Sequence, residues 1–112
     1  MARVKSPSKK RHNKVRKQAK GFKQARRIRI KSAKEAILHA GQYAFIGRKL
    51  KKRDFRKLWI MRINAATRKH SLSYSRFIDA LNKAEVRINR KMLADIAVKD
   101  PETFDKIVSE VK

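Results

Sequence analysis

Residues 73–83 read Ser-Tyr-Ser-Arg-Phe-Ile-Asp-Ala-Leu-Asn-Lys, and this stretch decides the fold class. Its large side chains recur at i, i+3, i+4 and i+7, at Tyr74, Phe77, Ile78 and Leu81. This spacing places them on one face of an α-helix. Ser73 stands just before the first of them and is a favoured N-cap residue. The stretch therefore predicts a short helix that buries one side.

Two further apolar stripes with helical spacing follow it. One comes after Asn89 and consists of Met92, Leu93, Ile96 and Ala97. The other comes after Asp100-Pro101, an N-cap followed by proline at the first helical position, and consists of Phe104, Ile107, Val108 and Val111. No segment alternates with a period of two for long enough to predict a strand. We therefore expect three short helices and an all-α fold.

A long helix is expected before these three. Residues 25–69 are rich in strong helix formers, and Phe55, Trp59, Ile63 and Ala66 share one side of the later part. That side gives the short helices a surface to pack on, so we expect Trp59 to belong to the core. Two glycines inside this helix, at positions 41 and 47, each cost about 1 kcal/mol relative to alanine. A bend between them is the corresponding expectation.

The N-terminal half carries most of the charge. Met1–Lys34 contains 15 lysines and arginines and no acidic residue, and the whole chain has a formal charge of +24 in 112 residues. Self-repulsion opposes compact folding of such a segment alone, so it implies a polyanionic partner. We predict a basic RNA-binding extension over residues 1–58, helical and ordered on RNA, and a small all-helical globular domain over residues 59–112. The fold class is then a long basic N-terminal helical extension followed by a small C-terminal helical domain.

Composition excludes several function classes. The chain has no cysteine, and its three histidines are too far apart for a helical metal pair. Glu35 and Asp54 are isolated among cations, where we expect local salt bridges, and the later acids suit helix caps. The longest uncharged run, Ala36–Gly47, is too short to span a bilayer. We expect no enzyme, no cofactor, no small-molecule substrate and no membrane partner.

The candidate binding residues are cations interleaved with aromatic and polar groups. Cations neutralise phosphates, and an aromatic ring in the basic half offers a surface on which an unpaired base stacks. Five of the six residues in Arg48–Arg53 are cations, so charge lies on every side of the helix there. The candidate RNA-binding residues are Arg3, Lys5, Lys9, Lys10, Arg11, His12, Lys14, Arg16, Lys17, Lys20, Phe22, Lys23, Arg26, Arg27, Arg29, Lys31, Tyr43, Arg48, Lys49, Lys52, Arg53, Arg56, Arg62, Asn64 and Arg68.

Charge and helicity leave one alternative open, a DNA-binding nucleoid or regulatory protein that uses its short helices as a helix-turn-helix. Such a motif usually has a tight turn, often with glycine. Leu72–Lys112 contains no glycine, and its basic residues are spread over two helices and their link. The sequence therefore favours RNA over DNA.

Several blocks of this chain resemble the bacterial-type large-subunit ribosomal protein L20 family. They are Met1–Lys5, Lys17–Phe22, Ala40–Phe45, Phe55–Ala66, Ser73–Ile78 and Arg90–Ala97, in register from Met1 to about Val98. The resemblance implies direct binding to large-subunit (23S-type) ribosomal RNA, a role early in subunit assembly, and neighbouring ribosomal proteins as partners. It also implies a place in the cytoplasm, in a bacterial-type ribosome, with an organellar ribosome as the other host. In some members of the family it implies repression of their own messenger RNA.

Overall fold

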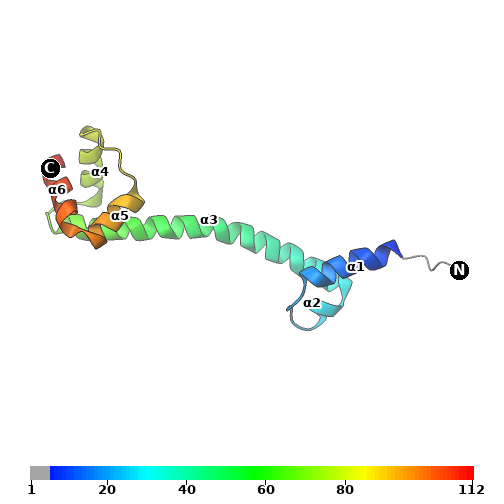
Figure 1. The fold of residues 1–112 in the computed structure, drawn as a ribbon. Helices are drawn as coiled ribbons and strands as arrows, with labels where there is room; N and C mark the ends of the chain where they lie inside the picture. The colour runs from blue at the N-terminus through cyan, green and yellow to red at the C-terminus, as the bar shows by residue number, and fades with distance from the viewer. Residues whose placement is uncertain (1–5) are drawn as a thin grey trace. The chain divides into compact units, whose positions relative to one another are not determined.

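The computed structural model describes residues 6–112, and every regular element in that range is a helix. In chain order the helices are α1 (Pro7–Gln18), α2 (Ala25–Ile28), α3 (Ile30–Arg68), α4 (Tyr74–Lys83), α5 (Arg90–Lys99) and α6 (Pro101–Val111). The all-α prediction is confirmed, with a long helix followed by three short ones (Figure 1). No helix within residues 6–112 is long and apolar enough to cross a membrane.

The chain divides into two compact units, Met1–Lys49 and Leu50–Lys112. The first holds α1, α2 and the beginning of α3, and the second holds the remainder of α3 with α4, α5 and α6. We call them the N-terminal unit and the C-terminal unit. By sequence they differ sharply in charge, with 17 basic residues against one acidic residue in the first and 16 against 8 in the second.

The hydrophobic core lies in the C-terminal unit and is built from the predicted stripes. Phe77 and Phe104 are at most 1% exposed, and their rings pack 5.5 Å apart at an interplanar angle of 48°. Trp59 is half-buried at the edge of this core and stacks on the exposed Phe55. The prediction that Trp59 belongs to the core is therefore only partly correct, because Trp59 packs against the core without being one of its buried residues. The fully buried members, one or two from each helix, are Ile63, Phe77, Leu81, Leu93, Ala94, Phe104 and Val108.

Each of the helices α4, α5 and α6 begins at a side-chain cap. The backbone N–H of Arg76 donates to Ser73 Oγ at 3.4 Å, and that of Met92 donates to Asn89 Oδ1 at 2.9 Å. The N–H of Thr103 donates to Asp100 Oδ1 at 3.1 Å. These bonds satisfy donors that the first turn of a helix leaves without partners. The predicted caps at Ser73 and Asp100 are confirmed.

Two helices end at residues in the left-handed conformation, and neither residue is glycine. Ser71 follows α3 with φ 60°, and Glu85 follows α4 with φ 55°. Behind each, a six-to-one hydrogen bond closes the helix, from Leu72 N–H to Thr67 O at 3.2 Å and from Val86 N–H to Leu81 O at 3.0 Å. This is the Schellman arrangement, which normally places glycine at the left-handed position.

A polar contact joins the end of α3 to α6. His70 Nε2 lies 2.6 Å from Asp105 Oδ1, and Lys112 Nζ donates to the His70 carbonyl oxygen at 3.5 Å. Asp105 is thus the side-chain partner of His70. Because Asp105 lies 35 positions from His70 in the sequence, tertiary packing brings the two side chains together and no local sequence pattern indicates the contact.

The N-terminal unit departs from the prediction at one point. The helix expected from residue 25 to residue 69 is interrupted at Arg29, whose backbone is extended (φ −80°, ψ 122°). Its carbonyl oxygen accepts the Ala33 N–H at 2.8 Å, so Arg29 begins α3 without a side-chain cap. The isoleucines on either side are β-branched and disfavour a helix slightly. Beyond this break, α3 continues through both of its glycines.

Candidate nucleic-acid interface

The lysines and arginines of the candidate set lie on the surface of both units. All of those that the structure describes are exposed, on α1, α2 and α3, in residues 19–24, and at Arg29 between α2 and α3. His12 is half-buried on α1. Two candidates, Arg3 and Lys5, lie outside the described residues. The described side chains can therefore reach phosphate oxygens, which position a protein on nucleic acid without reading its sequence.

Acidic side chains do not neutralise the cations of the N-terminal unit within residues 6–112. The two ion pairs in this range join Lys83 to Asp79 at 2.8 Å and His70 to Asp105 at 2.6 Å, both in the C-terminal unit. The salt bridges predicted for Glu35 and Asp54 are therefore absent from the described part of the chain, and that prediction was wrong. An exposed ion pair adds little to folding stability in water, because holding two long side chains together costs conformational entropy.

Helix ends add to the positive character of α1. Its first turn contains no acidic residue, and its last turn carries Arg16 and Lys17. Cations at a helix C-terminus are stabilised by the helix dipole. Arg16 and Lys17 are nevertheless exposed, so they can also contact a phosphate backbone. Such uncompensated charge attracts counterions, and their release drives association with RNA.

The two aromatic candidates both belong to the N-terminal unit. Phe22 is half-buried in the segment between α1 and α2, and Tyr43 on α3 is 68% exposed. The Tyr43 ring stacks on His39, one turn earlier, with ring centroids 6.2 Å apart and planes at 24°. A tyrosine this exposed gains little from burial, so part of its ring remains accessible to a base.

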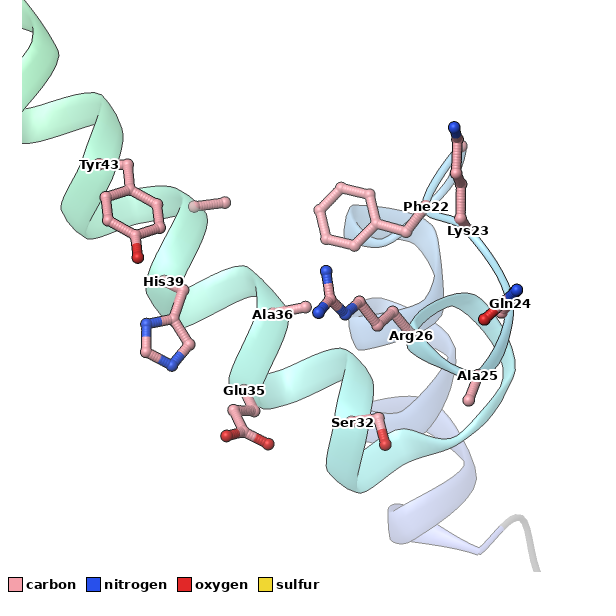
Figure 2. Close-up of a pocket in the computed structure, with 12 residues that line it drawn as sticks. Phe22, Lys23, Gln24, Ala25, Arg26, Ser32, Glu35, Ala36, His39 and Tyr43 are labelled. Carbon is pink, nitrogen blue, oxygen red and sulfur yellow. The ribbon is translucent and has the colours of Figure 1, made fainter.

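These aromatic residues line an open groove of about 1140 Å³, and all of its lining residues belong to the N-terminal unit. Figure 2 shows Phe22 and Arg26 projecting toward α3, while Glu35, His39 and Tyr43 follow one another along that helix. Ala36 and Ala40 lie on the same stretch of α3, and their small side chains leave the space open. The groove thus combines flat rings, cations and one carboxylate.

The sequence did not predict this groove or its residues His39 and Glu35. By its spacing from the other histidines, His39 fits no helical metal pair, and the sequence predicts only a local salt bridge for Glu35. A signal was present, because Glu35, His39 and Tyr43 are spaced four apart and so share one face of a helix. Helical spacing does not show where the segment that carries Phe22 lies relative to α3, so the groove could be identified only from the folded structure.

In the C-terminal unit, the candidates at the end of α3 are unequally accessible. Arg62 and Arg68 are exposed, whereas Asn64 is half-buried. The carbonyl oxygen of Asn64 accepts a hydrogen bond from the hydroxyl of Thr67, which is fully buried, at 3.1 Å. The two arginines can contact RNA directly, and Asn64 offers only part of its side chain.

Two exposed groups have shifted pKa values, and both shifts arise from helix structure. A hydrogen bond from Lys83 to Asp79, together with the aspartate charge, raises the pKa of Lys83. The hydroxyl and the backbone N–H of Thr103 donate to Asp100 and hold the pKa of that carboxyl below its usual range. Within residues 6–112, histidine and acidic side chains form no group of three that could hold a metal ion.

Comparison with known proteins gives one consistent family. The family model for ribosomal protein L20 matches residues 2–107. The large ribosomal subunit protein bL20 of Finegoldia magna is 52% identical over all of this chain and 97% of its own length. The bL20 proteins of Chloroflexus aggregans and Clostridium botulinum are 52% and 51% identical, over all of this chain and 96% of theirs. None of this supports the DNA-binding alternative. The chain therefore belongs to the ribosomal protein L20 family.

Proposed function

We propose that this chain is a structural constituent of the large ribosomal subunit that binds large-subunit ribosomal RNA directly and supports early subunit assembly. Membership of the L20 family supports the ribosomal role. The observation that carries RNA binding is the exposed cationic surface of the N-terminal unit, which no described carboxylate neutralises. A phosphate backbone supplies the missing negative charge. The role is structural and not enzymatic.

The two parts of the chain divide this work. Residues 1–58 form the basic extension, and its contacts are mainly with phosphates, since it is dense in cations and poor in groups that read bases. Residues 59–112 form the globular domain, which recognises the shape of one RNA site through groups such as Arg62 and Arg68. Ribosomal RNA folding around the extension explains the assembly role, because one long basic element can hold several RNA segments together.

Other partners follow from the same surface. Neighbouring large-subunit ribosomal proteins would contact the apolar side chains that remain exposed on α3, such as Leu38 at 75%. If the messenger RNA of this chain folds like the ribosomal binding site, it would compete with ribosomal RNA for the globular domain. Repression of that messenger would then depend on residues 59–112 rather than on the extension.

Co-sedimentation tests the proposal. The tagged full-length chain should sediment with large ribosomal subunits after a mild salt wash, and crosslinking followed by sequencing should recover large-subunit ribosomal RNA. Free small subunits and chromosomal DNA are the comparison fractions. Recovery mainly with DNA, or equally with all fractions, would contradict a specific ribosomal role.

A further inference from the structure

Gly41 and Gly47 lie inside α3, although nothing in the described fold requires glycine there. Glycine is the least favourable residue in a helix interior apart from proline. Both glycines are exposed, neither has a positive φ, and a Cβ added at either would meet no surrounding side chain or packed segment of residues 6–112 within 4 Å. Alanine would therefore fit at both positions and would favour the helix. Two uses remain for such a glycine, bending of the helix and close approach of another molecule to its backbone.

The surface beside Gly41 favours close approach. Phe45, Arg48 and Lys49 stand four, seven and eight positions after it, so they share one face of α3 with it, within the N-terminal unit. Phe45 is 53% exposed, and both cations are exposed as well. We call these four residues the Gly41 face. It presents bare helix backbone, one apolar ring and two cations to a molecule that lies against α3.

Lys49 leans along this face toward Gly41. Long side chains on an α-helix point back toward its N-terminus, over the preceding turn. Lys49 follows this rule, since its Nζ lies 4.4 Å from the centroid of the Phe45 ring, one turn earlier. No ion pair among residues 6–112 includes Arg48 or Lys49. Both charges are therefore available to an anion that lies beside Phe45.

A ribose–phosphate strand of RNA matches the Gly41 face better than a protein segment does. The C–H groups of a ribose pack against an apolar ring, and the phosphates on either side of that ribose meet the cations. A protein segment could fill the space above Gly41 equally well, but it would need acidic side chains opposite both Arg48 and Lys49. The N-terminal unit has 17 basic residues against one acidic residue, so its charge favours a polyanion.

We propose that a ribose–phosphate strand of large-subunit ribosomal RNA crosses α3 directly over Gly41. One ribose lies against the bare backbone of the helix and contacts Phe45, and Arg48 and Lys49 hold the adjoining phosphates. A Cβ at position 41 pushes the strand away from the helix. The proposal rests on the proposed ribosomal-RNA binding and adds a place where the strand touches the helix backbone.

Affinity for a large-subunit ribosomal RNA transcript is the first test, and two full-length variants separate close approach from bending. Alanine and leucine are both strong helix formers, so Gly41→Ala and Gly41→Leu stiffen α3 to a similar degree but differ in volume. Gly41→Ala should weaken binding about 2- to 5-fold and Gly41→Leu about 10- to 100-fold, because a larger side chain overfills a close contact more severely. Circular dichroism of the free variants should show no loss of helix. Equal losses of affinity would assign the effect to stiffening and overturn the close approach.

Gln42→Leu is the matched control, because it adds a leucine at an exposed position of the same turn but on another side of the helix. It should bind the transcript as well as the original chain does. A loss as large as that of Gly41→Leu would show that any added leucine on this turn weakens binding, and the contact at Gly41 would be overturned. If Gly41→Leu binds the transcript normally but enters large subunits poorly, the Gly41 face contacts a neighbouring protein instead of RNA.

Hydroxyl-radical cleavage of the same complexes is the second test, since these radicals attack exposed riboses whatever the base. The original chain should protect a short run of riboses that Gly41→Leu leaves open to cleavage, while other protections persist. Arg48→Gln should also weaken binding less in the Gly41→Leu background than in the original chain, because the displaced strand no longer reaches Arg48. Unchanged affinity and unchanged ribose protection with Gly41→Leu would overturn the contact, although RNA binding would stand. If the original chain fails to bind the transcript, the proposed function itself is wrong.

Discussion

Replacing Glu85 with glycine is expected to stabilise the C-terminal unit. Glu85 is held at φ 55° by the hydrogen bonds that end α4, its own N–H donating to Asn82 O at 3.1 Å and the Val86 N–H donating to Leu81 O at 3.0 Å. Val86 also packs against the core, so the chain cannot relax this conformation without losing that contact. The Glu85 side chain is exposed and forms no ion pair among the described residues.

The size of the effect follows from two opposing terms. A residue with a Cβ pays about 1–2 kcal/mol in the left-handed conformation, and glycine removes that cost. Glycine also raises the conformational entropy of the unfolded chain, and this lowers the free energy of unfolding by about 0.4–1 kcal/mol. The free energy of unfolding should therefore rise by about 0.5–1 kcal/mol. In a domain of this size, 1 kcal/mol raises the melting temperature by about 4–8 °C.

The single tryptophan provides the assay. Trp59 packs at the edge of the core, so its fluorescence during urea and thermal unfolding reports on the C-terminal unit rather than on the extension. Glu85→Ala is the matched control, since it removes the carboxylate and keeps the Cβ. Glycine should stabilise and alanine should not. If the two variants change stability equally, the effect comes from charge, and the argument from backbone strain is refuted.

Three further outcomes are expected. Phe104→Ala should lower the free energy of unfolding by about 3–5 kcal/mol, because it removes a fully buried ring that packs on Phe77; an unchanged urea midpoint would contradict this. The lowered pKa of Asp100 means that its carboxylate stabilises the fold above its ordinary pKa of 3.8 and that this stabilisation is lost as the pH falls through the lower folded value. Asp100→Asn should therefore show a smaller loss of stability between pH 5 and pH 2 in urea titrations, and an identical pH profile would argue against it. If the chain contacts on the order of ten phosphates, log K against log salt should slope near −7 to −9, and deleting residues 1–58 should reduce the slope by more than half. Equal slopes would show that the extension does not supply the phosphate contacts.

The helices could be predicted because their signals are local. The cap at Ser73, the Asp100-Pro101 pair and the apolar stripes each act within one or two turns, and the structure confirms them. The interruption at Arg29 carried no such signal, since neither proline, glycine nor a capping side chain stands there. The left-handed conformations of Ser71 and Glu85 could not be predicted either, because glycine is the usual sequence signal for that conformation and neither residue is glycine.

The candidate site shows a similar division. Charged side chains are exposed by default, so the cationic surface could be listed from the sequence. The groove could not, because it depends on where the segment carrying Phe22 lies against α3. The contact of His70 with Asp105 likewise joins residues far apart in sequence, which a search for helical spacing does not reveal.

The distribution of the core along the chain has a consequence for synthesis. Ile63 comes from α3, while Phe104 and Val108 come from α6, so the C-terminal unit cannot close before residue 108 has been made. The cations of α1, α2 and α3 are synthesised earlier. At about 5–20 residues per second, roughly 2–8 s separate the end of α3 from Val108. During translation the basic extension therefore meets cellular RNA as a nascent chain, while the domain behind it is still incomplete.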